Sequence, residues 1–197
     1  MIELQPPFRR ATRDDVQVMA DFVHFASEGL ALYLWTKMAG PGGDPWAFGR
    51  ERAGRETGAF SYRNTIVAEH DGRAVAGLIG FALPEHAEPI PETMPAMFVP
   101  LQELENLAPG TWYVNVLAAY PEQRGRGYGG ALLAVADRLA EDAGNSGLSI
   151  IVADTNTGAR KLYERSGYRE AGKRKMVKED WVHPGTDWVL LTKAAGT

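Results

Sequence analysis

The sequence has 197 residues, of which 45% are hydrophobic and 23% charged, proportions that fit a single folded globular domain spanning 1–197. A formal net charge of −4 argues against a nucleic-acid binder that depends on bulk attraction to phosphate. The absence of cysteine excludes disulfides, thiolate metal sites and a cysteine nucleophile. Because the N-terminus lacks a signal-peptide pattern and no apolar run is long enough to span a bilayer, we expect a cytoplasmic protein without a membrane partner.

The first third of the chain predicts a short strand followed by a helical lobe over residues about 13–56. The strand covers residues 8–12, and Thr12 is a candidate cap for an amphipathic helix over residues about 13–26. A second apolar helix follows, and a glycine-rich breaker ends it. Asp44 and Pro45 then resemble a cap and a first-turn proline, which predict a third helix.

The middle of the chain predicts a hairpin and an insertion. Two β-type runs, residues 65–69 and 74–81, flank Asp71-Gly72, a dipeptide typical of tight hairpin turns. Residues about 84–110 are an insertion rich in proline and glutamate, with apolar residues partly at helical spacing.

The last part alternates strands and helices. Trp112 to Ala119 is a buried strand, a glycine-rich turn follows, and a helix covers residues 131 to about 143. A strand over residues 148–153, a helix opening near Asn156 and two final strands complete the chain. The order of elements predicts an α+β fold with a mixed sheet.

The turn after the strand, Arg124 to Gly130, carries the clearest chemical signal. A glycine-rich turn before a helix presents backbone N–H groups and the positive end of the helix dipole to one point, which suits a phosphate. The glycines also fit G-x-G-x-x-G, the dinucleotide fingerprint, and Asp154 stands where an acidic ribose ligand would. Against that alternative, residues 120–124 separate the turn from the strand, the remaining chain is too short for a second nucleotide-binding half, and the preceding strands form a hairpin.

A second pattern agrees with more of the chain. Arg124 to Gly129 reads Arg-x-x-Gly-x-Gly, and downstream stands Asn-x-x-Ala-x-x-Leu-Tyr-x-x-x-Gly-Tyr, from Asn156 to Tyr168. Together these motifs resemble the GNAT superfamily of acetyl-CoA-dependent N-acetyltransferases, best over residues about 112–176. The resemblance implies a sheet of about seven mostly antiparallel strands, with a splayed parallel pair and flanking helices.

The resemblance also implies roles for the cofactor-binding residues. The pantetheine arm of acetyl-CoA would bind the backbone of Leu117 and Ala119, and the Leu117 N–H would stabilise the oxyanion. The pyrophosphate would rest on backbone N–H groups of the turn. The positions implied for the cofactor are Leu117, Ala118, Ala119, Arg124, Gly125, Arg126, Gly127, Tyr128, Gly129, Gly130, Asn156 and Tyr163.

Two of these residues have a structural alternative. Asn156 would bind the pantetheine amides, or it caps the helix that follows, and both roles can coexist. Tyr163 would protonate the leaving CoA thiolate, or it is an aromatic core residue. Because Leu162 and Tyr163 are adjacent on a helix, they point in different directions, and we expect Leu162 to face the core.

The proton acceptor for the attacking amine is missing from the pattern. Many GNAT enzymes carry a glutamate on the fourth strand, where this chain has Tyr113 and Asn115, so Glu28, Glu69 or a water relay remain as candidates. A catalytically silent CoA-binding module is therefore an alternative to the enzyme.

The four histidines lack metal-ligand spacing, so no metal is expected. The expected partners are acetyl-CoA and an amine, and a homodimer is left open. Acids that would attract a cationic amine, or form a solvated face, are Glu85, Glu88, Glu92, Glu103 and Glu105.

Overall fold

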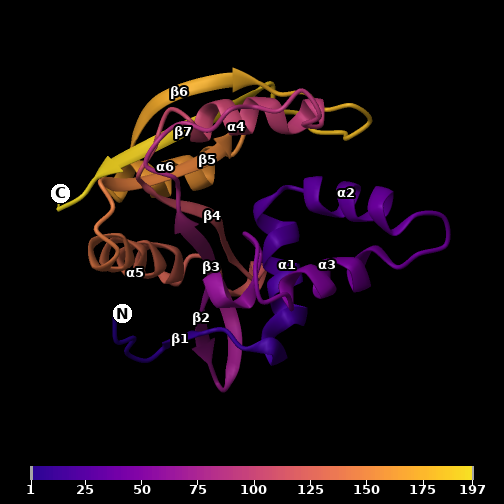
Figure 1. Ribbon diagram of the computed structural model, residues 1–197. Coiled ribbons are helices and arrows are strands. Elements are labelled where there is room, and N and C mark those ends of the chain that lie inside the picture. Colours follow the sequence, from indigo (N-terminus) through magenta and orange to yellow (C-terminus); the bar gives the residue numbers. More distant parts are fainter. Residues whose placement is uncertain (1, 197) are drawn as a thin grey trace. The chain divides into compact units, whose positions relative to one another are not determined.

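The computed structural model describes residues 2–196 and contains a seven-stranded mixed sheet (Figure 1). The strand order is β1-β2-β3-β4-β5-β7-β6. β4 pairs with β5 in parallel through Trp112–Val114 and Leu148–Ile150, whereas the pairs β1–β2, β2–β3, β5–β7 and β6–β7 are antiparallel. The predicted α+β class and the mostly antiparallel mixed sheet are confirmed.

The elements follow the predicted order closely. The strands are β1 (Phe8–Arg10), β2 (Thr65–His70), β3 (Arg73–Ala82), β4 (Trp112–Ala119), β5 (Gly147–Ala153), β6 (Arg169–Lys175) and β7 (Asp187–Ala194). The helices are α1 (Val16–Ala26), α2 (Leu30–Ala39), α3 (Pro45–Ala53), α4 (Val99–Glu105), α5 (Tyr128–Asp142) and α6 (Thr157–Arg165). Two helices begin three residues from the predicted position. A 3₁₀ helix (Arg13–Asp15) precedes α1, which begins at Val16, and α5 begins at Tyr128 and takes Gly129 and Gly130 into its first turn.

The chain divides into two compact units. The N-terminal unit contains residues 3–80 and 115–132, and the C-terminal unit contains residues 2, 81–114 and 133–196 of the described chain. The boundary therefore crosses β3, β4 and α5.

The N-terminal unit is built from β1, β2 and β3 with helices α1 to α3. Helices α2 and α3 run beside each other, joined by the glycine-rich loop (Figure 1). Thr12 and Asp44 cap the elements that follow them, as predicted, and Asp71 and Gly72 both take positive φ in the hairpin turn. Its core includes Met19, Phe22, Trp35, Val67 and Ile79.

A glycine on β3 allows α1 to approach the sheet. A Cβ added at Gly77 would overlap the ring of Phe22, which is fully buried on α1. The absence of a side chain at this position therefore fixes how closely the helix and the strand pack.

The C-terminal unit packs α4 along β6 and β7 (Figure 1). Leu104, Ala108 and Leu190 form the buried contact, with Ile151 and Trp188 beside them. On α5, the carboxylate of Asp137 accepts hydrogen bonds from the Lys193 ammonium of β7 at 2.9 Å. This ion pair holds the C-terminal part of α5 to the last strand.

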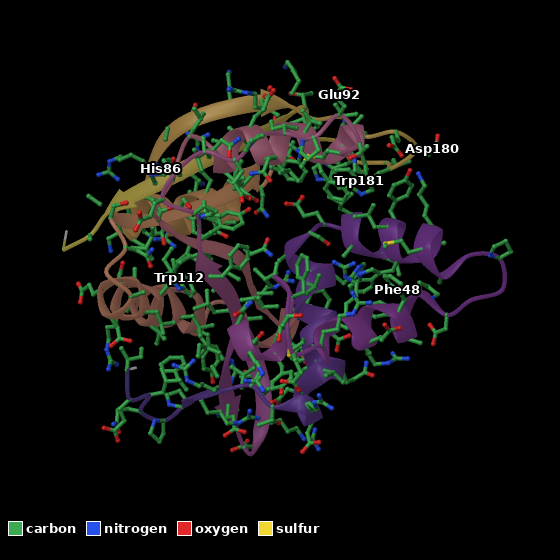
Figure 2. All side chains as sticks on the ribbon, in the orientation of Figure 1. Phe48, His86, Glu92, Trp112, Asp180 and Trp181 are labelled. Atoms are coloured by element: carbon green, nitrogen blue, oxygen red, sulfur yellow. The ribbon has the colours of Figure 1, made fainter. Side chains whose placement is uncertain are left out.

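Stacked rings make the β6–β7 loop rigid. Trp181, labelled in Figure 2, stacks on His183 with ring centroids 4.5 Å apart and on Trp188 at 6.0 Å. The Nδ1 atom of His183 accepts a hydrogen bond from the Gly185 N–H at 3.0 Å. His183 therefore has a structural role in the loop.

Replacing Gly77 tests this packing. We expect Gly77→Ala to lower the free energy of unfolding by about 1–3 kcal/mol, because the new methyl group must displace a fully buried ring. Urea unfolding followed by circular dichroism measures the change. Gly158→Ala is the control, since a Cβ at Gly158 meets nothing within 4 Å in helix α6. Equal stability of the two variants would contradict the packing argument.

Candidate active site

The turn between β4 and α5 is anchored by Tyr120. Its hydroxyl donates a hydrogen bond to Asp21 Oδ2 at 2.5 Å, and its ring packs edge-on against Phe22 and Phe25 of α1. Its backbone N–H donates to the Val75 carbonyl of β3 at 3.1 Å. Partial burial and the Asp21 carboxylate raise the pKa of Tyr120 above its usual range, so this hydroxyl keeps its proton. These contacts of Tyr120 therefore hold the start of the turn against α1 and β3.

The backbone of the turn is open on the side where a ligand would approach. Gly125 and Gly127 have φ of 76° and 89°, the left-handed region that favours glycine. A Cβ added at Gly125, Gly127 or Gly130 would meet no atom within 4 Å. The first helical hydrogen bond of α5 runs from Ala131 N–H to the Gly127 carbonyl at 3.1 Å. The N–H groups from Gly125 to Gly130 donate no hydrogen bond to any residue from 2 to 196.

These N–H groups suit an anion. The first N–H groups of a helix have no intrahelical partner, and the helix dipole adds partial positive charge at that end. A turn with unused donors and no side-chain obstruction is the arrangement that binds phosphate groups at helix N-termini.

The two arginines of the turn differ in their surroundings. Arg124 Nε donates to the Ala119 carbonyl at 3.3 Å, and its guanidinium lies 5.9 Å from the centre of the Phe25 ring. Arg124 therefore ties the turn to the end of β4 and to α1. Arg126 is exposed. Leu117, Ala118 and Ala119 are half-buried along the second half of β4.

Asn156 caps α6. Its side-chain oxygen accepts a hydrogen bond from the Ala159 N–H at 3.1 Å, which confirms the capping alternative. A role toward pantetheine would thus fall to the amide nitrogen. Asn156 and Tyr163 are seven residues apart, so they lie on the same face of the helix.

Tyr163 is buried, with 6% of its surface exposed, whereas Leu162 is half-buried. The expectation that Leu162 takes the core position and leaves Tyr163 outside it is wrong. The Tyr163 ring lies 6.0 Å from that of Tyr168, which is also buried. Tyr163 fills space beside a second ring, and such packing favours an aromatic residue at this position.

Asp154 has a structural role. Its carboxylate accepts hydrogen bonds from the Thr186 N–H at 3.0 Å and the Thr186 hydroxyl at 2.9 Å, and its backbone N–H donates to Asp187. The carboxylate that would bind a ribose in a dinucleotide enzyme is thus used to fix the start of β7. Nothing in the chain supports the dinucleotide alternative.

The comparison with known families decides the family. The model of the acetyltransferase (GNAT) family matches residues 31–168. The chain belongs to the GNAT family. No curated protein matches it in sequence.

Solved structures agree with the GNAT fold. "The crystal structure of acetyltransferase" is 20% identical and has a TM-score of 0.64, with 95% of this chain and 98% of that chain covered. An N-acetyltransferase from Staphylococcus aureus Mu50 is 17% identical, with a TM-score of 0.62 and coverage of 94% and 98%. A GNAT family acetyltransferase from Elizabethkingia anophelis with acetyl-CoA bound is 19% identical, with a TM-score of 0.50 and coverage of 66% and 74%. At these identities the likeness concerns the fold.

The GNAT chain offers one carboxylate that sequence reasoning did not distinguish. Glu105 ends α4 and lines a cavity of about 90 Å³ in the C-terminal unit. Burial raises the pKa of Glu105 to about 7, and the nearby charge of Glu88 adds to the effect. Glu103, by contrast, is half-exposed and pairs with Arg174 at 2.6 Å. The alternative of a uniformly solvated acidic face is wrong for Glu105.

The remaining candidate sites are structural or undecided. Glu69, a candidate base, is held by Arg9 Nε at 2.9 Å where β1 meets β2. Among residues 2–196, no group of three or more acidic or histidine side chains is arranged to hold a metal ion. Within the same range, none of the helices has the length and apolar character needed to cross a bilayer.

The raised pKa of Glu105 has a consequence for stability. Below the ordinary pKa of glutamate the side chain is protonated in both the folded and the unfolded state, so its ionisation does not change the free energy of unfolding. Between that value and about pH 7 the unfolded state ionises first, so the folded state loses stability as pH rises. We expect Glu105→Gln to raise the free energy of unfolding at pH 8, on the order of 1–3 kcal/mol, with little gain at pH 4.

Thermal unfolding at both pH values measures this difference. Glu103→Gln on the same helix is the control, and we expect it to stabilise the protein at neither pH, because it removes an ion pair. If Glu105→Gln instead lowers the free energy of unfolding at pH 8, burial of the charged carboxylate does not destabilise the folded protein.

Proposed function

We propose that this GNAT protein is an acetyl-CoA-dependent N-acetyltransferase that moves an acetyl group to a primary amine of a small molecule or peptide. The observation that carries the proposal is the turn from Gly125 to Gly130, whose donors are unused and whose backbone is unobstructed. Acetyl-CoA bound to one GNAT structure and the N-acetyltransferase name of another support the choice of cosubstrate and reaction. The chain has no cysteine, so the amine attacks the thioester directly in a ternary complex.

The cofactor half of this proposal rests on backbone groups. The pyrophosphate binds the N–H groups of the turn, and the pantetheine arm pairs with Leu117 and Ala119. The Leu117 N–H faces the thioester oxygen, and such an oxyanion donor contributes roughly 3–4 kcal/mol to transition-state stabilisation. Because these contacts use the main chain, alanine at position 119 does not prevent the binding of the pantetheine arm.

In the proposed reaction, Tyr163 acts on the leaving CoA thiolate. A thiolate needs a proton as the carbon–sulfur bond breaks, and a phenol can supply it as a general acid. Tyr163 lies two helical turns beyond Asn156 on the same face of α6, so one helix would present an amide to pantetheine and a hydroxyl to the sulfur.

Transfer to an amine panel tests the proposal. The protein is incubated with acetyl-CoA and n-butylamine, tyramine, spermidine or an alanyl dipeptide, while free thiol and the mass of the product are followed. Thiol release with an acetylated amine is the expected result. CoA binding by calorimetry without transfer to any amine would instead favour a silent CoA-binding module, and absence of CoA binding would refute the proposal.

Gly130→Ala separates folding from cofactor binding. The position is helical and its Cβ would meet nothing within 4 Å, so alanine should raise the melting temperature. The same methyl group would point into the space assigned to pyrophosphate. We therefore expect the Kd for CoA to rise about tenfold or more, because the loss of even one hydrogen bond to a charged group costs about 1.5–3 kcal/mol. Calorimetry and thermal unfolding measure the two effects. Unchanged CoA affinity in a stabilised variant would place the pyrophosphate elsewhere.

Two neighbouring tyrosines provide a matched test of the acid. We expect Tyr163→Phe to lower kcat by about 10²-fold or more, the usual contribution of a general acid, without weakening CoA binding. Tyr168→Phe is the control, because the Tyr168 hydroxyl is buried without a hydrogen-bond partner. Its removal should leave kcat unchanged and raise stability slightly. Equal rates in the two variants would exclude Tyr163 as the acid.

A further inference from the structure

The proposed transfer needs a proton acceptor that the strand pattern does not supply. A primary amine is an ammonium ion at neutral pH, and an ammonium has no lone pair with which to attack a thioester. On β4, Tyr113 and Asn115 stand near the position where many GNAT enzymes carry a glutamate, and Glu69 is held by Arg9. The inference below rests on the proposed function and asks which group of this chain takes the proton.

The cavity of about 90 Å³ in the C-terminal unit contains a half-buried carboxylate, that of Glu105, which has no partner among the described residues. Its walls include Phe81, Glu88, Gln102, Glu105 and Asn106, and His86 at its rim is labelled in Figure 2. The carboxylate of Glu105 makes no hydrogen bond or ion pair with any residue from 2 to 196. No structural contact therefore explains a half-buried carboxylate at this position.

The amide side chains of the wall are already engaged. Asn106 Nδ2 donates to the Glu88 carbonyl at 2.8 Å, and Asn106 Oδ1 accepts from the Glu88 N–H at 3.0 Å and from Gln102 Nε2 at 3.2 Å. These bonds hold the chain around Glu88 against α4. The amide nitrogens of Asn106 and Gln102 therefore serve acceptors other than the Glu105 carboxylate.

Tyr113 connects this cavity to the proposed acid. Tyr113 pairs with Ser149, which lies on the same face of β5 as Ile151, and Ile151 packs against the α4 residue Leu104. The Tyr113 side chain thus faces α4, and its ring lies 5.7 Å from that of the cavity residue Phe81. Burial first, and then the charges of Glu105 and Tyr163, raise the pKa of Tyr113, so each of these two groups lies close enough to act on Tyr113.

We propose that Glu105 accepts the proton of the substrate ammonium and that the cavity receives the ammonium end of a cationic primary amine. The ammonium gives one proton to the carboxylate, and the neutral nitrogen then attacks the thioester carbon. The new carbon–nitrogen bond forms as the carbon–sulfur bond breaks with its electron pair on sulfur. The second proton leaves the nitrogen and ends on the thiolate through Tyr163. Glu105 returns its proton to solvent, which is the one proton released in each turnover.

The cavity is large enough for the end of an amine. Its volume of about 90 Å³ is several times the roughly 10–15 Å³ that a cavity needs to hold one water molecule. An unbranched aminomethyl end fits such a space. Glu88 on the same wall adds a second negative charge that favours a cation.

The protonation state of Glu105 agrees with this role. Burial and then Glu88 raise its pKa to about 7, and a base is most effective when its pKa is near the operating pH. The titratable groups that face it are Glu88 and His86 from the insertion, Tyr113 from β4 and, beyond Tyr113, Tyr163 from α6. Arg174 of β6 pairs with Glu103 and is not among the cavity residues.

The pH dependence of kcat/KM tests the proposal, with the amine of the panel that is transferred fastest. In the unaltered protein we expect kcat/KM to fall as pH drops below about 7, where Glu105 gains a proton. Glu105→Gln should lower kcat/KM by about 10²-fold or more and abolish this acidic limb, with CoA affinity unchanged. Glu103→Gln, on the same helix, should keep the rate and the limb. Thermal unfolding of both variants shows that they are folded.

A third variant tests the identity of the titrating group. Glu88→Gln removes the neighbouring charge, so the acidic limb should move to lower pH. A Glu105→Gln variant that keeps the rate and the limb would overturn the inference, as would equal losses in Glu105→Gln and Glu103→Gln. An unaltered protein that acetylates none of the amines refutes the proposed function, whereas transfer with an unaffected Glu105→Gln variant refutes only the role of Glu105.

Discussion

The candidate site depends on the course of the backbone between Tyr120 and Ala131. Two glycines there have φ of 76° and 89°, a conformation that other residues adopt only with strain. This course brings the chain from the end of β4 into the first turn of α5 while keeping side chains away from the exposed N–H groups. Tyr120, bonded to Asp21 and to Val75, fixes one end of the turn, and the first hydrogen bond of α5 fixes the other. An anion site made in this way needs no lysine, because the main chain and the helix dipole supply the positive charge.

The chemistry of the GNAT chain is divided between main-chain and side-chain groups. Backbone donors in residues 117–130 serve the cosubstrate in the proposed function, and they tolerate variation in side chain. In the same proposal, side chains of the C-terminal unit serve proton transfer, with Tyr163 on the leaving-group side and Glu105 on the amine side. Burial and the charge of Glu88 raise the pKa of Glu105 to about 7, which suits a base that works near neutral pH.

Much of the fold could be predicted because each element carries a local signal. The capping residue Thr12, the Asp71-Gly72 turn and the apolar run of β4 each specify their structure within a few residues. The start of α5 was predicted too late, because glycines reduce helix propensity even where the first turn tolerates them.

Burial was harder to predict than secondary structure. Leu162 and Tyr163 are both compatible with a helix core, and only the neighbouring Tyr168 ring decides that the tyrosine is buried. Glu105 is four residues after Leu101 and adjacent to Leu104, which places it at the edge of the apolar face of α4. That spacing was a usable signal. The unpaired state of its carboxylate was not, since the sequence does not show that the Asn106 side chain bonds to the backbone of Glu88 rather than to Glu105.

The central claim is that the turn from Gly125 to Gly130 binds the pyrophosphate of CoA. Titration of the ¹⁵N-labelled protein with CoA, followed by amide chemical shifts, tests it most directly. The account predicts that the largest shifts occur at the N–H groups of this turn, with further shifts at Leu117 and Ala119. Saturable binding that leaves the amides of Gly125 to Gly130 unmoved would contradict it.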